Sequence, residues 1–152
     1  MDLIRALASG PKSFHGEGIN HEGERFIGQL QVQPLVNGSA VLLSYVAKLQ
    51  DGMVVHEEAS LVGRRQDGTL CLWPVMSELP AVFPHVQISE LSRDQTDTVV
   101  FAFGSRDDRD SFREEIAISL SKSGTLTYAH AWGLPGGEFA DRSSCLLLAS
   151  EA

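Results

Sequence analysis

The sequence alternates between apolar and polar residues with a period of two over most of its length, and short turn signals interrupt the alternation repeatedly. Gln29 to Gln33 alternates residue by residue, and Ala40 to Leu49 carries its large apolar groups on one side. A period of two is typical of a β-strand, because successive side chains of a strand point to opposite faces. Strands joined by tight turns become antiparallel neighbours. The sequence therefore predicts an all-β protein.

About ten runs rich in β-branched, aromatic or alternating residues are predicted to be strands. Their expected bounds are Ser13 to Ile19, Phe26 to Pro34, Ala40 to Leu49, Met53 to Val62, Thr69 to Trp73, His85 to Leu91, Thr98 to Phe103, Phe112 to Leu120, Leu126 to Trp132 and Arg142 to Ala149. Open sheet edges invite aggregation, so such a sheet has to close on itself or double over. We predict a roughly ten-stranded antiparallel up-and-down β-barrel, with a β-sandwich as the competing architecture.

Helical periodicity is confined to the start of the chain, where Asp2 to Ala8 places Leu3, Ile4 and Leu7 on one face. A chain of 152 residues with 43% hydrophobic residues has the size and composition of one compact domain. We therefore expect a single β-barrel domain over residues 1–152, with a short N-terminal helix and lead-in at 1–12 and the barrel at 13–149.

Charge and composition exclude several classes of partner. The net charge of -8 disfavours nucleic acid, whose binding depends on Lys and Arg neutralising phosphates. No segment has the apolar length of a membrane-spanning helix, and Arg5 interrupts the short apolar stretch at the start, so we expect a cytoplasmic protein. Cys71 and Cys145 are isolated among apolar neighbours, which predicts buried, unreactive thiols.

The segment Trp73 to Pro84 differs from the other connections because it contains three prolines and several large apolar groups. Prolines remove ladder hydrogen bonds, so we predict that this segment is not a central strand. It is expected either to pack as a loop over one end of the core or to form a flap at a pocket mouth. In the second case Met76, Leu79 and Phe83 would contact a ligand.

Titratable residues are concentrated in Val55 to Gly68, where His56, Glu58, Ser60 and Val62 share one face of a predicted strand. In a barrel filled by side chains, His56 and Glu58 would point to solvent. In a ten-stranded barrel the interior is wide enough to hold polar groups and a small molecule. There, Glu58 would orient or charge the imidazole of His56. Both orientations are compatible with the sequence.

The order of several short motifs resembles the nitrobindin-like and fatty-acid-binding-protein-like barrels of the calycin group, which include the lipocalin-like folds. These motifs are Phe14-His15-Gly16-Glu17-Gly18, Gly38 before a strand with Tyr45, His56-Glu57-Glu58, Arg65-Gln66-Asp67-Gly68 and Leu126-Thr127-Tyr128. The resemblance spans roughly residues 13–149. It implies a ten-stranded barrel with an internal cavity and, in the nitrobindins, a haem b whose iron is held by a histidine near the C-terminus.

This sequence departs from the haem pattern at the comparable position, which falls near Arg142. Arginine cannot ligate iron because it stays protonated and offers no lone pair. Haem b would therefore need His130 or His56 as its ligand. His130 shares a predicted strand face with Tyr128 and Trp132, which suits either a ligand-binding wall or ordinary packing.

Three hypotheses about function follow. The preferred one is a noncatalytic barrel that binds a small apolar or aromatic molecule. The others are a haem protein with peroxide or nitrogen-oxide chemistry, and a small hydrolase or isomerase that uses His56 and Glu58. Neither a homodimer nor a monomer is excluded. The predicted ligand-binding residues are Tyr45, His56, Glu58, Trp73, Met76, Phe83, Tyr128, His130, Trp132 and Arg142.

No metal site is predicted. His15, Glu17, His21, Glu22 and Glu24 match no established zinc spacing and are expected to form a polar hairpin. The sequence also lacks a nucleophile elbow and a phosphate-binding glycine loop.

Overall fold

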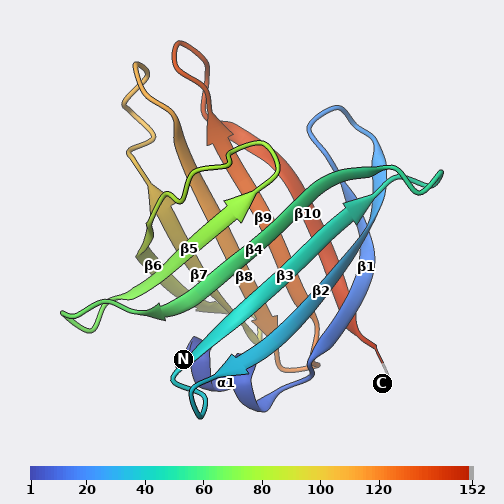
Figure 1. Cartoon of the computed structure of the whole chain (residues 1–152), viewed down its shortest axis with the longest axis vertical. Coiled ribbons are helices and arrows are strands. Elements are labelled where there is room, and N and C mark those ends of the chain that lie inside the picture. The colour runs from blue at the N-terminus through green and yellow to red at the C-terminus, as the bar shows by residue number, and fades with distance from the viewer. Residues whose placement is uncertain (151–152) are drawn as a thin grey trace.

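A computed structural model describes residues 1–150 and shows a closed antiparallel barrel of ten strands preceded by one short helix (Figure 1). Each strand pairs with its neighbours along the chain, and the first strand closes the barrel against the last. The elements are α1 (Leu3–Ser9), β1 (Ser13–Ile19), β2 (Arg25–Leu35), β3 (Ala40–Lys48), β4 (Val54–Arg64), β5 (Leu70–Met76), β6 (His85–Arg93), β7 (Thr96–Phe103), β8 (Arg113–Ser121), β9 (Leu126–Gly133) and β10 (Ala140–Ala149). The predicted fold class is confirmed, and the sandwich is excluded.

The helix α1 lies at the lower end of the barrel in Figure 1 and fills part of that end. Asp2 caps it by accepting a hydrogen bond from the Arg5 backbone at 3.2 Å. Leu3, Ile4 and Leu7 are buried, as the helical period predicts. Because this end of the barrel is packed with apolar side chains, room for a ligand is found towards the opposite end.

Two glycines of β1 allow the wall of the barrel to close tightly. A Cβ on Gly16 would lie 1.8 Å from the carbonyl oxygen of Leu146 on β10. A Cβ on Gly18 would lie 2.3 Å from the ring of Phe26 on β2, which lines the cavity described below. The glycines in the Phe14 to Gly18 motif therefore have a steric role, since any side chain there would displace a neighbouring strand or ring.

The first four residues of the segment Trp73 to Pro84 complete β5, which extends further than the predicted strand Thr69 to Trp73, but they do not form a central strand. Strand β5 pairs with β4 along its whole length but with β6 only at Cys71 and Leu72. Beyond Leu72, β5 therefore has a free edge, which is where a strand tolerates a proline such as Pro74. The rest of the segment is the yellow-green loop of Figure 1, which turns back before β6 begins.

None of the described residues forms a helix long and apolar enough to cross a membrane.

Candidate functional site

Strand β4 directs its polar residues into the barrel. Glu58, Ser60 and Val62 are buried and His56 is half-buried, whereas Glu57 and Leu61 on the other face are exposed. The alternative in which His56 and Glu58 point to solvent is therefore excluded. This orientation follows from the pairing with β3, which sets Tyr45 opposite Glu58 on the same inner face.

The carboxylate of Glu58 is the centre of a hydrogen-bond network. Its Oε1 accepts bonds from Nε2 of His56 at 3.1 Å and from Nε2 of His130 at 2.9 Å. Its Oε2 accepts bonds from the hydroxyl of Ser60 at 3.0 Å and from the hydroxyl of Tyr128. All four donors come from β4 and β9, so the network joins opposite parts of the barrel wall. A buried carboxylate with this many donors is held in one orientation.

The network also shifts the acidities of its members. Burial alone raises the pKa of Glu58, but His130 and His56 outweigh it and hold that pKa well below its usual range. Burial lowers the pKa of His56, but Glu58 and Glu78 outweigh it, so the net pKa is raised. Burial and the adjacent charge of Glu58 raise the pKa of Tyr128. Glu58 is thus an anion, and Tyr128 is a neutral donor to it.

The outer nitrogens of the two imidazoles are also engaged. Nδ1 of His56 donates to Glu78 at 2.9 Å, and Nδ1 of His130 lies 3.4 Å from the hydroxyl of Ser143. Because both partners of His56 are carboxylates, both of its nitrogens act as donors, and the ring is an imidazolium.

A cavity of about 380 Å³ opens beside this network at the end of the barrel opposite α1. Its volume lies within the range of about 300–1,000 Å³ that is usual for small-molecule sites. Its polar lining includes His56, His130 and Ser143. The apolar part of the lining consists of Phe26, Ala47, Val55, Met76, Leu79, Phe112, Trp132 and Leu134.

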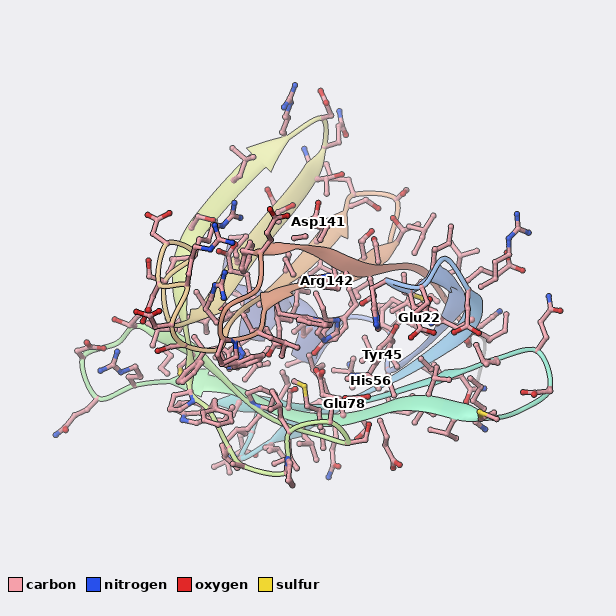
Figure 2. All side chains as sticks on the ribbon, turned by 90° about the horizontal axis from the view of Figure 1, so that it is seen from above. Glu22, Tyr45, His56, Glu78, Asp141 and Arg142 are labelled. Carbon is pink, nitrogen blue, oxygen red and sulfur yellow. The ribbon has the colours of Figure 1, made fainter. Side chains whose placement is uncertain are left out.

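Six of the predicted residues line this cavity: Tyr45, His56, Met76, His130, Trp132 and Arg142. Two others, Glu58 and Tyr128, lie directly behind His56 and His130 and support them. Figure 2 looks down on this end of the barrel, with Tyr45, His56 and Glu78 close together and Arg142 across from them. Ligand binding by these residues stays a prediction.

Two of the predicted residues do not line the cavity. Trp73 pairs with Leu61 on the outer face of the sheet, because the inner face of β5 carries Leu72 and Met76 instead. Phe83 packs one layer behind the lining, with its ring 4.7 Å from that of Phe103. Of the predicted flap residues, Met76 and Leu79 therefore reach the cavity and Phe83 does not.

Arg142 is fixed at the rim by its neighbours. Its Nε donates to the carbonyl of Trp132 at 3.1 Å, its Nη2 donates to the carbonyl of Glu138 at 2.9 Å, and its guanidinium lies 4.3 Å from the Trp132 ring centre. These contacts place a positive charge and an aromatic face together beside the cavity.

Five further polar residues line the cavity and were not among the predicted ligand-binding residues: Asn20, His21, Glu78, Glu114 and Ser143. Glu78 lies in the proline-rich loop, and Glu114 follows a charged turn at the start of β8. Asn20 and His21 belong to the β1–β2 turn, and the His21 ring packs edge-on against Trp132 at 5.5 Å. These residues come from separate parts of the chain, so only the closed barrel brings them together.

The residues present do not fit a haem. An axial histidine must offer a free nitrogen to iron held in an open macrocycle plane. The Nε2 atoms of His56 and His130 both point into the wall at the buried carboxylate of Glu58, where a planar macrocycle has no room, and their Nδ1 atoms face Glu78 and Ser143. Arg142, which stands where the resemblance places the ligand, is bonded to two carbonyls of the rim.

The ligand atoms of His56, Glu58 and His130 lie within 4.8 Å of one another, as they would in a site able to hold a metal ion. The earlier cluster near the N-terminus does not converge in this way, because His15 and Glu17 are on the outer side of β1. Both cysteines are buried and free, as predicted.

Comparison with known proteins supports the fold alone. No protein-family model and no curated protein matches the sequence. The fold is similar to that in the crystal structure of Rv2717c from M. tuberculosis, with a TM-score of 0.76, 12% identity and 99% of each chain covered. The comparison thus agrees with the ten-stranded antiparallel closed barrel described above.

Proposed function

We propose that this protein binds a small, partly apolar molecule in the cavity of the barrel and does not transform it. The observation that carries this proposal is a cavity of about 380 Å³ whose wall is mainly apolar and whose inner end is the polar network of Glu58. Apolar walls with a few converging polar groups are typical of small-molecule sites, because burial supplies affinity and the polar groups fix orientation.

The lining suggests how such a molecule would be oriented. Its apolar body would pack against Phe26, Met76 and Leu79 near the wall and mouth. Its polar group would face His56 and His130, where a buried anion and an imidazolium lie side by side. A flat or aromatic body would also suit the Trp132 side chain, which lines the cavity.

Binding is favoured over hydrolysis or isomerisation because His56 has no nitrogen available for a substrate proton. Its Nε2 donates to Glu58 and its Nδ1 to Glu78. A general base needs a free nitrogen within hydrogen-bond reach of the proton that it removes.

The two tryptophans provide a direct test, because Trp132 lines the cavity and Trp73 lies on the outer face. The variant Trp73→Phe leaves Trp132 as the sole indole emitter. Titration with 4-bromobenzoate, a heavy-atom quencher that acts only at contact distance, after treatment with a chelator, should quench Trp132 in a saturable manner with one probe per chain. The probe is apolar with one polar end, as the cavity requires.

The matched control is Trp132→Phe, in which only Trp73 reports. Its emission should change little, because the outer face is separated from the cavity by the sheet. The variant Ala47→Phe fills part of the cavity and should weaken the quenching of Trp132. Equal quenching of both tryptophans, or quenching unaffected by Ala47→Phe, would mean that the probe binds the surface, and the proposal would fail.

A further inference from the structure

Three potential metal ligands meet at the inner end of the cavity. Nε2 of His56 and Nε2 of His130 both point at Oε1 of Glu58, at 3.1 and 2.9 Å, and the three atoms lie within 4.8 Å of one another. In a tetrahedral site with metal–ligand distances of about 2.0–2.2 Å, neighbouring ligand atoms are separated by roughly 3.3–3.6 Å. The two observed separations from Oε1 are a few tenths of an ångström shorter, so a small outward shift of the three groups brings them to that spacing.

We propose that His56, Glu58 and His130 bind a divalent transition-metal ion of the Zn²⁺ class. Two imidazoles and one carboxylate are a ligand set that such ions accept. The ion occupies the point on which the two imidazoles converge, and Glu58 turns its Oε1 aside to become the third ligand. Strands β4 and β9 carry all three ligands, so a closed sheet holds them.

Residues that hydrogen-bond to the three proposed ligands hold them in orientation, as the hydrogen-bond partners of ligands do in known metal sites. Glu78 accepts a hydrogen bond from Nδ1 of His56, and the Ser143 hydroxyl faces Nδ1 of His130, which leaves Nε2 as the coordinating atom of each ring. Tyr128 and Ser60 hold Oε2 of Glu58 from behind, so Oε1 is the oxygen that is free to bind the ion.

Charge balance also suits a cation at this position. Glu58 is buried, and the groups that donate to it are two histidines, a serine and a tyrosine. Without an ion, the protons on Nε2 of the two histidines provide the positive side of these contacts. When the ion enters, each Nε2 gives up its proton to solvent and donates a lone pair to the metal instead.

The bound ion has at least one coordination position facing the cavity. His56 and His130 line the cavity, whereas Glu58 lies behind them in the wall. Three protein ligands leave a position for water or for an atom of a bound molecule. Only this last step, in which the polar end of a ligand coordinates the ion, rests on the proposed function.

The other histidines provide internal comparisons. His85 is buried against the single carboxylate of Glu114, and His15 is exposed beside Ser150. In the part of the chain that the structure describes, His56, Glu58 and His130 form the one group of three or more converging ligands.

The test uses the full chain after chelator treatment, titrated with Co²⁺ as a spectroscopic substitute for Zn²⁺. We expect one equivalent to bind and to produce visible d–d absorption that Zn²⁺ abolishes. His130→Ala and Glu58→Gln should weaken Co²⁺ binding by more than about 100-fold. This is more than the loss usual when only a hydrogen-bond partner of a metal ligand is removed. His15→Ala is the matched control and should leave the titration unchanged.

Circular dichroism shows whether each variant keeps its β-sheet spectrum. If a variant fails to fold, X-ray absorption of the wild-type Zn²⁺ protein decides, with two imidazole ligands expected per ion. A wild-type protein that binds no stoichiometric Co²⁺, or that binds it equally well as His130→Ala, would overturn the proposal. The fluorescence test of the cavity uses chelator-treated protein, so a failure of the metal site leaves its result independent.

Discussion

The barrel contains two buried clusters of histidine and glutamate, and they differ in what surrounds the carboxylate. Glu58 is shared by two imidazoles and two hydroxyls beside the cavity. Glu114 also lines the cavity, but it pairs with the single imidazole of His85 at 2.8 Å. The first cluster joins β4 to β9, and the second joins β6 to β8.

The second cluster has the features of a structural brace. Nδ1 of His85 donates to the carbonyl of Phe83 at 2.6 Å, which ties the end of the proline-rich loop to the start of β6. Strand β6 pairs with β5 at only two positions, Cys71 and Leu72, so this seam has few ladder contacts. The His85–Glu114 pair therefore stabilises the weakest closure of the barrel.

The difference shows which buried charges are available for binding. His85 and Glu114 saturate each other and a backbone carbonyl. Glu58 instead accepts hydrogen bonds from four groups, and two of them, His56 and His130, line the cavity. A ligand or ion can therefore replace a proton of one imidazole while the carboxylate keeps its other partners. A buried carboxylate is therefore available for binding when it has several donors, and burial alone does not make it available.

The largest expected effect is on stability. His85→Ala should lower the free energy of unfolding by about 3–4 kcal/mol, because it leaves Glu114 buried without its partner. Urea denaturation followed by circular dichroism measures this loss. His15→Ala removes an exposed histidine and should cost less than about 0.5 kcal/mol. A change below 1 kcal/mol for His85→Ala would show that the pair is not a brace.

His130→Ala should cost less stability, about 1–2 kcal/mol, because Glu58 keeps its bonds to His56, Ser60 and Tyr128. The same urea titration measures it. The variant should nevertheless lose Co²⁺ binding, which His85→Ala retains if it is folded. If His130→Ala and His85→Ala lost equal amounts of stability, the two clusters would not differ in how well each glutamate tolerates the loss of its histidine.

Each cluster has a buried thiol beside it, and both thiols should make stability fall at alkaline pH. Burial raises the pKa of Cys71, near His85, and of Cys145, near Tyr45. A thiol in the unfolded chain ionises first, at about pH 8.5, so unfolding releases protons above that pH. Between pH 8 and 9.5 the two thiols together should reduce the free energy of unfolding by about 1–2 kcal/mol.

Urea titrations of Cys71→Ala, Cys145→Ala and the double variant separate the two contributions. The double variant should lose the part of the pH dependence that comes from the thiols. The part that comes from the N-terminal amine of Met1 and from the tyrosines should remain. An unchanged slope would show that the thiols are not protected in the fold.

The smallest effect on stability is expected for Glu78→Gln, since this side chain is half exposed at the cavity mouth. The free energy of unfolding should change by less than about 0.5 kcal/mol. Co²⁺ affinity should fall by roughly 10-fold, because Glu78 orients Nδ1 of His56. An affinity equal to that of the wild type would mean that Glu78 has no orienting role.

The fold could be predicted from the sequence because the position of each strand is indicated by residues within or next to that strand. Alternation and turn dipeptides such as Asp67-Gly68 give most strand positions to within a few residues. The β6–β7 connection is tighter than predicted, because Asp94 and Gln95 form the turn with positive φ although neither is a glycine. The extension of β5 through Pro74 was missed because its free edge depends on where β6 departs.

The site could be predicted only in part. His56 and Glu58 stand two residues apart, so strand alternation puts them on one face. His130 lies 72 residues from Glu58, and no local pattern states that β9 faces β4 across the barrel. Trp73 was misplaced because an apolar run such as Leu70 to Trp73 does not reveal which of its faces points inward.

We propose the cavity beside Glu58 as the binding site. Native mass spectrometry of the protein purified from its own host tests it most directly, with Ala47→Phe expressed and purified in parallel. We expect a noncovalent small-molecule adduct on the wild-type chain that is absent or much reduced on the filled variant. Identical spectra for the two proteins would contradict it.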